Sequence, residues 1–465
     1  MKKEVITQRL STMNEKGERV FIYAAKIKGH YQRLKLKVHA FLILLFLILP
    51  WIKVNGEQSL LLDIANRRFN VFGLILWAHD APLIFFILAI VVFGLALATA
   101  VWGRVWCGWA CPQTVFLDGI FRKVDEFIEG NHSKRYKLDK APWDFRKVRI
   151  KSFKYMVYLI LSMIITHSFL AYFVGVEELK DMVRSPPSEN WFSFMFIVLT
   201  TSSLMFNFLW FREQFCIIMC PYGRFQSVLM DENSLAPLYD AKRGEPRRQG
   251  KGEEGKAEGD CIDCFKCVAV CPTGIDIRNG IQMECVACTA CIDACDGIME
   301  KVKKPKGLIR YNSEAGENKR KMFGARSLVY AISIVAAIVG LTFFLNKRTP
   351  YAISMLRQKG IPFRHAQGEV LGYSNFFKLY AKNQVSKEMK VTVALSEQYR
   401  SDNIKVIIPQ NPLVIKPEGV HRLPVFVKFS KDYKFLKNRD LTLDFKIEIE
   451  GKVYLKTKSF HLAFD

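Results

Sequence analysis

The sequence of 465 residues carries little charge, and most of the chain lacks cysteine. Only 24% of the residues are charged and 50% are hydrophobic, which is too apolar for a disordered chain. All 12 cysteines lie between residues 107 and 295, so the last 120 residues contain none. Flavin and nicotinamide fingerprints are absent too. These absences exclude a secreted disulfide scaffold and a simple soluble domain, while the length alone allows about three domains.

Long apolar runs are what the sequence has instead. Five runs of at least 17 residues can cross a hydrocarbon core about 30 Å thick. They are Val38–Val54, Pro82–Trp102, Phe153–Val176, Trp191–Phe211 and Ser327–Leu345. Phe69–Ala78 is too short to span, and we expect it to be interfacial or re-entrant. The first run follows a 37-residue tail and is not a cleavable signal. We therefore predict an α-helical transmembrane bundle.

Basic residues predict the orientation of these spans. Lys and Arg outnumber Asp and Glu by 68 to 44, giving a net charge of +24. The tail before the first span carries 10 of them and segment 103–152 carries 11, but loops 55–81 and 177–190 carry two each. Positive loops stay inside, which predicts a bacterial inner-membrane protein with cytoplasmic segments 1–37, 103–152 and 212–326. The C-terminal part would then be periplasmic, and this account of the charge leaves nucleic-acid binding a poor alternative.

Composition divides the chain further. Phe21–Val38 mixes apolar and basic residues, as either a surface-lying helix or a solvated basic flank does. Asp240–Asp260 is rich in glycine and charge and predicts a mobile linker. We expect six segments: a basic tail (1–37), a membrane domain (38–230), a linker (231–260), a ferredoxin-type domain (261–312), a last transmembrane helix (327–345) and a C-terminal domain (346–465).

Eight cysteines form one tight array after residue 260. The array reads Cys-x2-Cys-x2-Cys-x3-Cys twice, over residues 261–271 and 285–295, and a proline follows the first run. This spacing is typical of two [4Fe–4S] clusters in which the fourth cysteine of each run binds the other cluster. We therefore expect one cluster on Cys261, Cys264, Cys267 and Cys295. We expect the second cluster on Cys285, Cys288, Cys291 and Cys271.

Zinc or disulfides are the structural alternatives for these eight cysteines. Zinc usually takes paired CxxC units with four ligands per ion, and disulfides are disfavoured on the reducing side of a membrane. The second run departs from the first because it ends Cys295-Asp296, without a proline. We expect this change to keep the ligand set, and either to expose the first cluster or to place a negative charge near it. Two linked clusters would carry single electrons.

The other four cysteines form two CxxxCP motifs, each directly after a pair of predicted spans. The motifs begin at Cys107 and Cys216, and their offset of 109 residues indicates an internal repeat. Cysteines four residues apart share a helix face, and the proline ends that helix and suits the first position of a new one. The candidate ligands for a shared ion are therefore Cys107, Cys111, Cys216 and Cys220.

The surroundings of these four thiols favour a soft metal ion. Three arginines flank the motifs: Arg104, Arg212 and Arg224. We expect these cations and the helix N-termini to lower the thiol pKa values, and copper(I) is the first-row ion that thiolates favour most. The alternative is that the cysteines only pack, as Met219 would unless it adds a thioether. His39 and His167 lie at opposite ends of the predicted spans, which disfavours a haem.

The C-terminal domain alternates apolar and polar residues with the period of a β-strand. The alternating runs are Met389–Leu395, Ile404–Pro409, Pro424–Phe429, Leu441–Glu450 and Val453–Lys458. About seven short strands in this length predict an immunoglobulin-like sandwich. The domain holds no group of His, Ser and carboxylates that implies catalysis, so we interpret it as a docking or structural module.

Six motifs along the chain carry a family resemblance. They are WCGWACP (106–112), FCIIMCPYGRFQ (215–226), YDAKRGEPR (239–247), GDCIDCFKCVAVCPTGIDIRNGIQMEC (259–285), CIDACDGIM (291–299) and PKGLIRY (305–311). Together with the terminal sandwich, they resemble the CcoG (FixG/RdxA) family of accessory proteins for cbb3-type cytochrome c oxidase. The resemblance implies a cupric reductase that converts Cu(II) to Cu(I), with copper bound and reduced at Cys107, Cys111, Cys216 and Cys220.

The resemblance also implies partners. These would be oxidase-assembly and copper-delivery proteins, a cytoplasmic electron donor of unknown identity and membrane lipid, and the oligomer to consider is a homodimer. Two other functions stay open. A quinol dehydrogenase that feeds a periplasmic reductase shares the CxxxCP and ferredoxin motifs but usually lacks the sandwich, and a non-catalytic scaffold would hold oxidase subunits.

Overall fold

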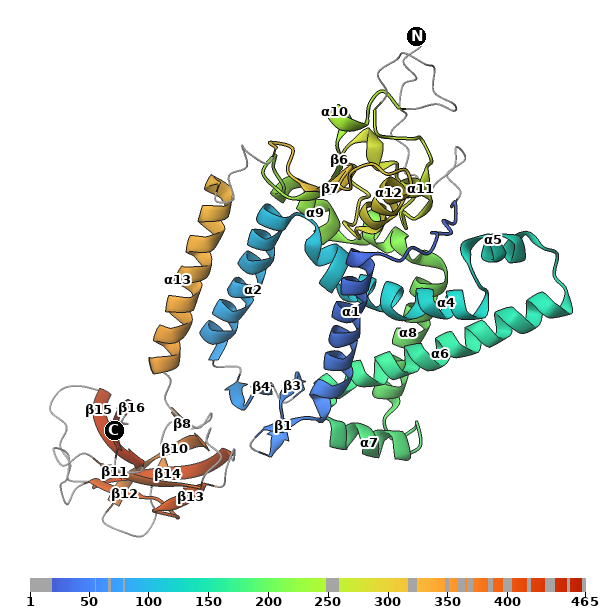
Figure 1. Ribbon diagram of the computed structural model, residues 1–465. Helices are drawn as coiled ribbons and strands as arrows, with labels where there is room; N and C mark the ends of the chain where they lie inside the picture. Colours follow the sequence, from blue (N-terminus) through green and yellow to red (C-terminus); the bar gives the residue numbers. More distant parts are fainter. Residues whose placement is uncertain are drawn as a thin grey trace, which may run out of the picture. The chain divides into compact units, whose positions relative to one another are not determined.

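The computed structural model describes residues 19–54, 56–65, 68–77, 80–247, 259–316 and 324–347 in the first part of the chain. In the last part it describes residues 351–357, 364–365, 371–383, 388–395, 404–415, 420–430, 440–449 and 452–461. The chain divides into two compact units, Met1–Phe344 and Leu345–Asp465. The first unit holds the apolar helices and the cysteines, and the second is built from strands (Figure 1).

Among the described residues, five helices are long and apolar enough to cross a membrane (Figure 1). They are α1 (His30–Ile48) with the short turn η1 (Leu49–Trp51), α2 (Ala81–Trp102), α6 (Phe145–Val174), α8 (Trp191–Phe206) with the π turn η5 (Asn207–Phe211), and α13 (Ala325–Lys347). Each coincides with one predicted run. Large apolar side chains remain exposed along them, as a lipid-facing surface requires, which makes this a multi-pass membrane protein.

Two of these helices begin earlier than predicted because their charged first turns are paired inside the protein. Helix α1 begins at His30 and not at Val38, and its buried Lys35 lies 2.7 Å from the Asp118 carboxylate. Helix α6 begins at Phe145 and not at Phe153, and its basic side chains are buried against carboxylates. A hydropathy window cannot see such pairs, since the partners lie elsewhere in the chain.

Neither interpretation of Phe21–Val38, a surface-lying helix or a solvated basic flank, describes the first half of the segment. Residues 20–29 are not helical, and the backbone N–H of Ala25 donates to the carbonyl of Ala269 at 2.9 Å. Ala24 and Ala25 are buried there, so the segment gains more by packing on the cysteine-rich insert than by lying on a surface. The part of the predicted basic tail before residue 19 lies outside the described residues.

The short apolar run Phe69–Ala78 is also not re-entrant. It contributes to an antiparallel sheet of three strands: β3 (Leu60–Asp63), β4 (Arg68–Val71) and β5 (Leu74–Trp77). A smaller hairpin precedes this sheet: β1 (Lys53–Val54) and β2 (Glu57–Gln58). Phe72 and Gly73 form the tight turn with φ of 50° and 86°, the positive values that a two-residue hairpin turn favours. Backbone N–H and C=O groups of this segment are therefore satisfied by hydrogen bonds between the strands.

Short helices connect the apolar ones. After α2 come η3 (Trp106–Ala110), α3 (Pro112–Phe116), η4 (Leu117–Phe121), α4 (Arg122–Ile128) and α5 (His132–Lys140). Helix α7 (Val176–Arg184) follows α6, and η6 (Phe215–Met219) and α9 (Pro221–Leu229) follow α8. The pieces after α2 and α8 share the order π turn, proline, helix, which supports the internal repeat.

The cysteine-rich insert begins earlier than predicted. Its elements are β6 (Ala236–Tyr239), α10 (Ala241–Gly244), α11 (Lys266–Ala269), η7 (Ile277–Asn279), α12 (Ala290–Lys301) and β7 (Ile309–Asn312). Strands β6 and β7 pair antiparallel, and Arg243 binds Asp260 at 2.5 Å. The predicted linker 231–260 is therefore wrong over residues 231–247, which are ordered by partners distant in sequence, and residues 248–258 lie outside the described residues.

The second unit consists of two antiparallel sheets. One orders β12 (Ile404–Ile407), β14 (Val420–Ser430), β10 (Leu371–Asn383) and β8 (Tyr351–Arg357), with β9 (Arg364–His365) beside β10. The other orders β13 (Leu413–Ile415), β11 (Met389–Leu395), β15 (Asp440–Ile449) and β16 (Lys452–His461). Alternate residues of both sheets, including Leu379, Val427, Val391 and Ile447, form one buried core. This packing confirms the predicted sandwich.

Each of the five predicted strand runs overlaps a strand of this unit, although the run Ile404–Pro409 extends beyond β12. The sequence pattern missed β8, β9, β10 and β13, so the described strands exceed the seven expected. Strand β10 was overlooked although its alternate residues Phe377, Leu379 and Ala381 are buried. The intervening Lys378 and Tyr380 face away from the core, but the aromatic residues on both faces obscure the alternation.

Candidate iron–sulfur and thiol sites

The two runs of the cysteine array fold into matching loops. In each run the residues on either side of the second cysteine have positive φ: Asp263 and Phe265 around Cys264, and Ala287 and Thr289 around Cys288. The left-handed residue after that cysteine is the N-cap of a helix, α11 or α12, whose second residue is the third cysteine. Each loop thus turns its first three cysteines around one point.

The thiols of the array gather around two adjacent cavities. One cavity is lined by Cys261, Cys264, Cys267 and Cys295. The other is lined by Cys271, Cys285, Cys288 and Cys291, and Cys267 also reaches it. The fourth cysteine of each run therefore lies with the first three of the other run, which is the grouping expected from the spacing. The assignment of each thiol as an iron ligand stays a prediction.

The cysteine thiols that line both cavities are suitable ligands for a positively charged iron–sulfur core. Burial raises the pKa of Cys267 to about 11 and those of Cys285 and Cys295 to about 12. Such buried thiols become thiolates when a metal centre supplies positive charge.

Charged residues fix the first loop of the array. Arg278, whose side chain is 2% exposed, pairs with Asp263 and lies 2.6 Å from Asp276. Its guanidinium also lies 4.2 Å from the centroid of the Phe265 ring. Asp296, which stands where a proline follows the first run, accepts a hydrogen bond from the N–H of Gly307 at 2.8 Å. The aspartate thus holds the end of the insert, and its charge contributes to the raised pKa of Cys295.

The two CxxxCP motifs have the same backbone conformation. Each contains a π turn in which the N–H of the second cysteine donates to a carbonyl five residues earlier: Cys111 to Trp106 and Cys220 to Phe215, both at 2.8 Å. Both of these cysteines are extended, and the following proline begins α3 or α9, as predicted. The turns are wider than the α-helix that the spacing suggested, and π turns often occur at functional sites.

The four CxxxCP thiols lie in one neighbourhood. The charges of Cys107, Cys111 and Cys220 all act on the pKa of Cys216. The Cys107 thiol donates to Oε1 of the buried Gln226 at 3.2 Å. These thiols gather without a closed coordination shell in the described residues.

The predicted lowering of the thiol pKa values is wrong for three of the four cysteines. Burial raises the pKa of Cys107 to about 12, and it raises the pKa of Cys111 and of Cys216 as well. Desolvation thus outweighs the helix N-termini. Of the three arginines, only Arg104 lowers the pKa of Cys107, and its effect is small. Burial thus favours the protonated form of these three thiols, and a bound cation would favour the thiolate.

The first CxxxCP turn lies directly on the second loop of the cysteine array. A Cβ atom at Gly108 would lie 2.5 Å from the carbonyl oxygen of Ala287 and 2.7 Å from that of Val286. Arg104, just before the turn, donates to the carbonyl of Cys285 at 3.0 Å. The thiol site and the second group of iron-ligand candidates are therefore in backbone contact.

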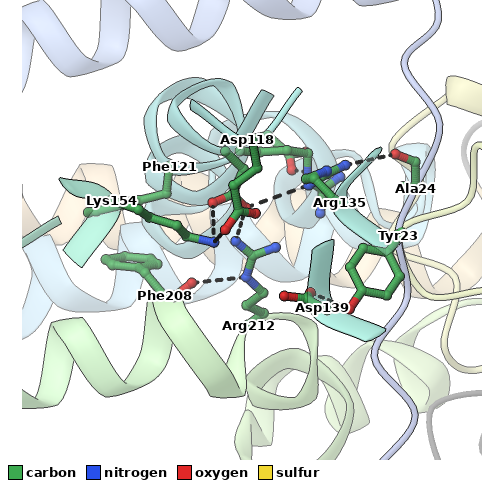
Figure 2. Close-up of polar contacts among 12 residues, drawn as sticks. Tyr23, Ala24, Asp118, Phe121, Arg135, Asp139, Lys154, Phe208 and Arg212 are labelled. Atoms are coloured by element: carbon green, nitrogen blue, oxygen red, sulfur yellow. Dashed lines mark hydrogen bonds and ion pairs between the residues drawn. The ribbon is translucent and has the colours of Figure 1, made fainter. Parts of the chain in front are cut away.

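A buried ionic cluster joins the two repeats (Figure 2). Asp125, which follows the first CxxxCP, pairs with Arg212, which precedes the second. Lys154 lies 2.8 Å from Asp125, and the Tyr158 hydroxyl donates to Asp125 at 2.8 Å. Arg212 also donates to the carbonyl of Phe208 at 2.9 Å. The position of Arg212 in the sequence predicts a role at the thiols, and Asp125 is not predicted, although a few acidic residues in the strongly basic segment 103–152 could have indicated such pairs.

The two histidines of the haem alternative differ in their surroundings. His39 on α1 is buried beside Gly119. His167 on α6 contacts the carbonyl of Met163 in its own helix at 2.8 Å through Nδ1. They do not share a partner.

Three family models match the chain. One described as a 4Fe-4S dicluster domain matches residues 211–314, and one described as a 4Fe-4S binding domain matches residues 83–131. A third, described as the IG-like fold at the C-terminal of FixG, matches residues 341–462. The first range contains the whole cysteine array and the second CxxxCP, and the second range contains the first CxxxCP.

Relatives of known name match long stretches of the chain. RdxB of Cereibacter sphaeroides is 35% identical over 365 residues, which cover 74% of this chain and 75% of RdxB. RdxA of the same organism is 36% identical over 329 residues, 67% of this chain and 69% of RdxA. The nitrogen fixation protein FixG of Rhizobium meliloti is 38% identical over 298 residues, 62% of this chain and 56% of FixG. The match thus spans little more than half the length of FixG.

The apolar helices, the cysteine cavities and the matched models define a membrane iron–sulfur protein of the oxidoreductase class. Within that class, the matches to RdxA, to RdxB and to the C-terminal domain of FixG point to one family. The chain belongs to the FixG/RdxA family.

Proposed function

We propose that this protein is a membrane-bound cupric reductase that converts Cu(II) to Cu(I) for the assembly of a cbb3-type cytochrome c oxidase. The observation that carries the proposal is the contact between the first CxxxCP turn and the second cysteine loop. Gly108 leaves no room for a side chain between them, and the CxxxCP thiols gather beside this contact. A thiol group next to a one-electron carrier suits the reduction of a metal ion by one electron.

The four thiols would act on copper as a substrate. Cys107, Cys111, Cys216 and Cys220 would bind the ion, and their softness favours Cu(I) over Cu(II), so that binding itself makes reduction easier. One electron converts Cu(II) to Cu(I), and iron–sulfur clusters supply single electrons when bound. Because burial raises the pKa of Cys107 and Cys216, copper binding to these two thiols would release protons to water.

The proposal also assigns parts of the protein to the two sides of the membrane. The clusters and all 12 cysteines would lie on the cytoplasmic side of a bacterial inner membrane, and the sandwich would lie in the periplasm. The excess of Lys and Arg in segments 1–37 and 103–152 supports this orientation. A reducing compartment would also keep the thiols free for copper.

Partners follow from the same proposal. Copper-delivery and oxidase-assembly proteins would receive the Cu(I), and the sandwich would serve as a docking module for them. The membrane lipid surrounds the five apolar helices. A homodimer is the oligomer that we would look for first. The match to the C-terminal domain of FixG favours this function over a quinol dehydrogenase that feeds a periplasmic reductase.

A double variant tests the proposed activity. In Cys107→Ala plus Cys216→Ala, each CxxxCP motif keeps one cysteine, and we expect Cu(II) reduction by dithionite-reduced protein to stop. A Cu(I)-specific chelator reports the product, and the visible spectrum of the clusters should remain as in the unaltered protein. The matched control is Ile218→Ala, because Ile218 lies in the second π turn and is partly exposed. It should reduce copper at the normal rate.

The outcomes separate the three functions. Normal copper reduction in the double variant would end the proposal. A scaffold would show no copper reduction in any form of the protein and would still capture oxidase subunits. A reductase-feeding protein would pass its electrons to a periplasmic acceptor regardless of the CxxxCP thiols.

A further inference from the structure

A large groove opens beside the second cysteine loop. It has a volume of about 880 Å³, which lies within the range of small-molecule sites. Its walls come from the segment before α1, from α1 itself, from η4 and α4, and from the cysteine-rich insert. The proposed copper reduction does not use this groove, because none of the four CxxxCP cysteines lines it.

His39 is the distinctive residue of the groove. It lies on α1 where the apolar part of that helix begins, and only 2% of the residue is exposed. Its Nε2 atom is buried and has no hydrogen-bond partner among the described residues. A buried ring nitrogen without a partner costs free energy unless something binds it. His39 lines the groove, so a ligand there can provide that partner.

Cys288 lines the same groove. This cysteine also lines the second cavity of the array, and its carbonyl accepts a hydrogen bond from Gln32 of α1 at 3.0 Å. A ligand in the groove would therefore lie between an unpartnered imidazole and a predicted iron ligand. Such a position suits a molecule that gives up protons and electrons together.

The rest of the lining suits an amphipathic ring. Ala25, Leu36 and Phe127 give the groove an apolar part. Part of its charged lining is paired: Asp118 lies 2.7 Å from Lys35 and 3.2 Å from Arg122, and Glu126 lies 2.6 Å from Lys26. The other charged side chains in the lining are Lys28, Arg33 and Lys123. The groove reaches the level at which α1 becomes apolar, so a molecule dissolved in lipid could enter it. The sequence contains no nicotinamide or flavin fingerprint, so no such cofactor of the chain itself accounts for the electrons.

We infer that this groove binds the head group of a membrane quinol and that His39 takes one of its protons. The inference rests on the proposed function, for which it names the electron donor. The quinol loses two electrons and two protons and becomes a quinone. The two electrons would pass singly to the clusters that the two groups of cysteines would hold, one hydroxyl proton would pass to Nε2 of His39, and the other would leave through the open side of the groove to water.

Binding is tested without turnover by photolabelling. The full-length protein, purified anaerobically in detergent with its clusters, is irradiated with an azido-ubiquinone, and the labelled peptides are identified by mass spectrometry. We expect label within residues 24–39, 118–127 or 270–290. We expect His39→Leu and Leu36→Trp to lower the labelling at least fivefold, the second by filling the groove. Label confined to other segments, or unchanged in both variants, would overturn the inference.

Cluster reduction provides a second readout. Decylubiquinol should bleach the visible absorption of the clusters, at a rate at least tenfold lower in His39→Leu. The matched control is His167→Leu, because His167 bonds within its own helix and does not line the groove. Equal rates in the two variants would contradict the role of His39. Leu36→Trp keeps the test valid if His39→Leu does not fold.

The two proposals can fail separately. Dithionite reduces the clusters without a quinol, so the copper assay on dithionite-reduced protein does not depend on the groove. If that assay succeeds and decylubiquinol neither labels nor reduces the protein, only the donor assignment falls. If decylubiquinol reduces the clusters and copper is never reduced, the donor assignment stands and the cupric reductase falls.

Discussion

Gly108 lies against the carbonyl oxygen of Ala287, and these two residues bring the thiol site and the second cysteine loop into contact. A Cβ atom at Gly108 would lie 2.5 Å from that oxygen, closer than real Cβ atoms come to backbone. Arg104 strengthens the contact by donating to the carbonyl of Cys285. The shortest connection between the two sites therefore depends on a residue without a side chain.

Replacing Gly108 should separate the two sites. In Gly108→Val the new side chain meets the backbone at two carbonyls, which cannot move aside as a flexible side chain could. We expect copper reduction to fall at least tenfold, equivalent to about 1.4 kcal/mol in the barrier, while iron content stays unchanged. The Cu(I)-chelator assay and an iron determination measure the two quantities.

Gly297→Ala is the control for that variant. Gly297 lies on α12, and a Cβ there would meet nothing within 4 Å. Since alanine favours a helix more than glycine does, the free energy of unfolding should stay equal or rise by up to about 1 kcal/mol. Copper reduction as fast in Gly108→Val as in Gly297→Ala would show that the contact is irrelevant to the activity.

The buried pair of Arg212 and Asp125 should be a main source of stability for the two-repeat arrangement. Arg212→Ala removes the cation while Asp125 stays buried, and breaking such a pair costs roughly 3 kcal/mol or more. The cost should be at the low end, because Lys154 still lies 2.8 Å from Asp125. Denaturant unfolding of the detergent-solubilised protein measures it. Lys180→Ala, which removes an exposed ion pair, should leave unfolding unchanged, and equal behaviour of the two variants would contradict the prediction.

Asp125 should also make the protein sensitive to acid. Burial alone raises the pKa of this carboxyl, but Arg212 and Lys154 outweigh burial and hold the pKa well below its usual range. An unfolded aspartate titrates near pH 4. The stabilisation is therefore fully present above about pH 4 and is lost as the pH falls further towards the folded-state pKa.

The measurement is the free energy of unfolding as a function of pH. In the unaltered protein it should fall from roughly pH 4 downward, and in Asp125→Asn this fall should be smaller, because the group that takes up the proton is gone. Asp118, whose pKa is lowered by Arg122 and Lys35 against its burial, should give the same effect in Asp118→Asn. Parallel curves for all three proteins would rule out the assigned carboxylates.

The features that the sequence predicted correctly are set by short-range spacing. The cysteine runs fold into matching loops because each run places its second cysteine between two left-handed residues. Pro112 and Pro221 begin helices because a missing N–H is harmless there. The apolar runs form helices because a lipid environment demands internal hydrogen bonds.

The features that the sequence did not predict depend on partners far along the chain. The residues around Ala236–Tyr239 do not indicate that this strand pairs with Ile309–Asn312. The predicted linker therefore includes a strand that belongs to the cysteine-rich insert. The thiol pKa values were predicted from neighbouring charges, but burial by the rest of the fold decides them. Arg212 was placed at the thiols by its position in sequence, although its side chain turns to Asp125.

The exchange of fourth cysteines between the two runs gives the last prediction. Cys271 belongs to the first run but lines the cavity of the second, and Cys295 does the reverse. We expect Cys271→Ala to disturb the cluster of Cys285, Cys288 and Cys291 and to leave the other, with a loss of up to about half of the iron. Low-temperature electron paramagnetic resonance of the reduced protein should show one cluster signal instead of two interacting ones.

The CxxxCP cysteines provide the comparison for that iron count. Residues 83–131 match a cluster-binding model but contain only Cys107 and Cys111, so a cluster there would need Cys216 and Cys220 as well. If these thiols bind copper and not iron, the variant Cys107→Ala plus Cys216→Ala keeps all the iron that Cys271→Ala loses. A loss of iron in the double variant would instead indicate a third cluster at the thiol site, and copper would then have to be reduced elsewhere.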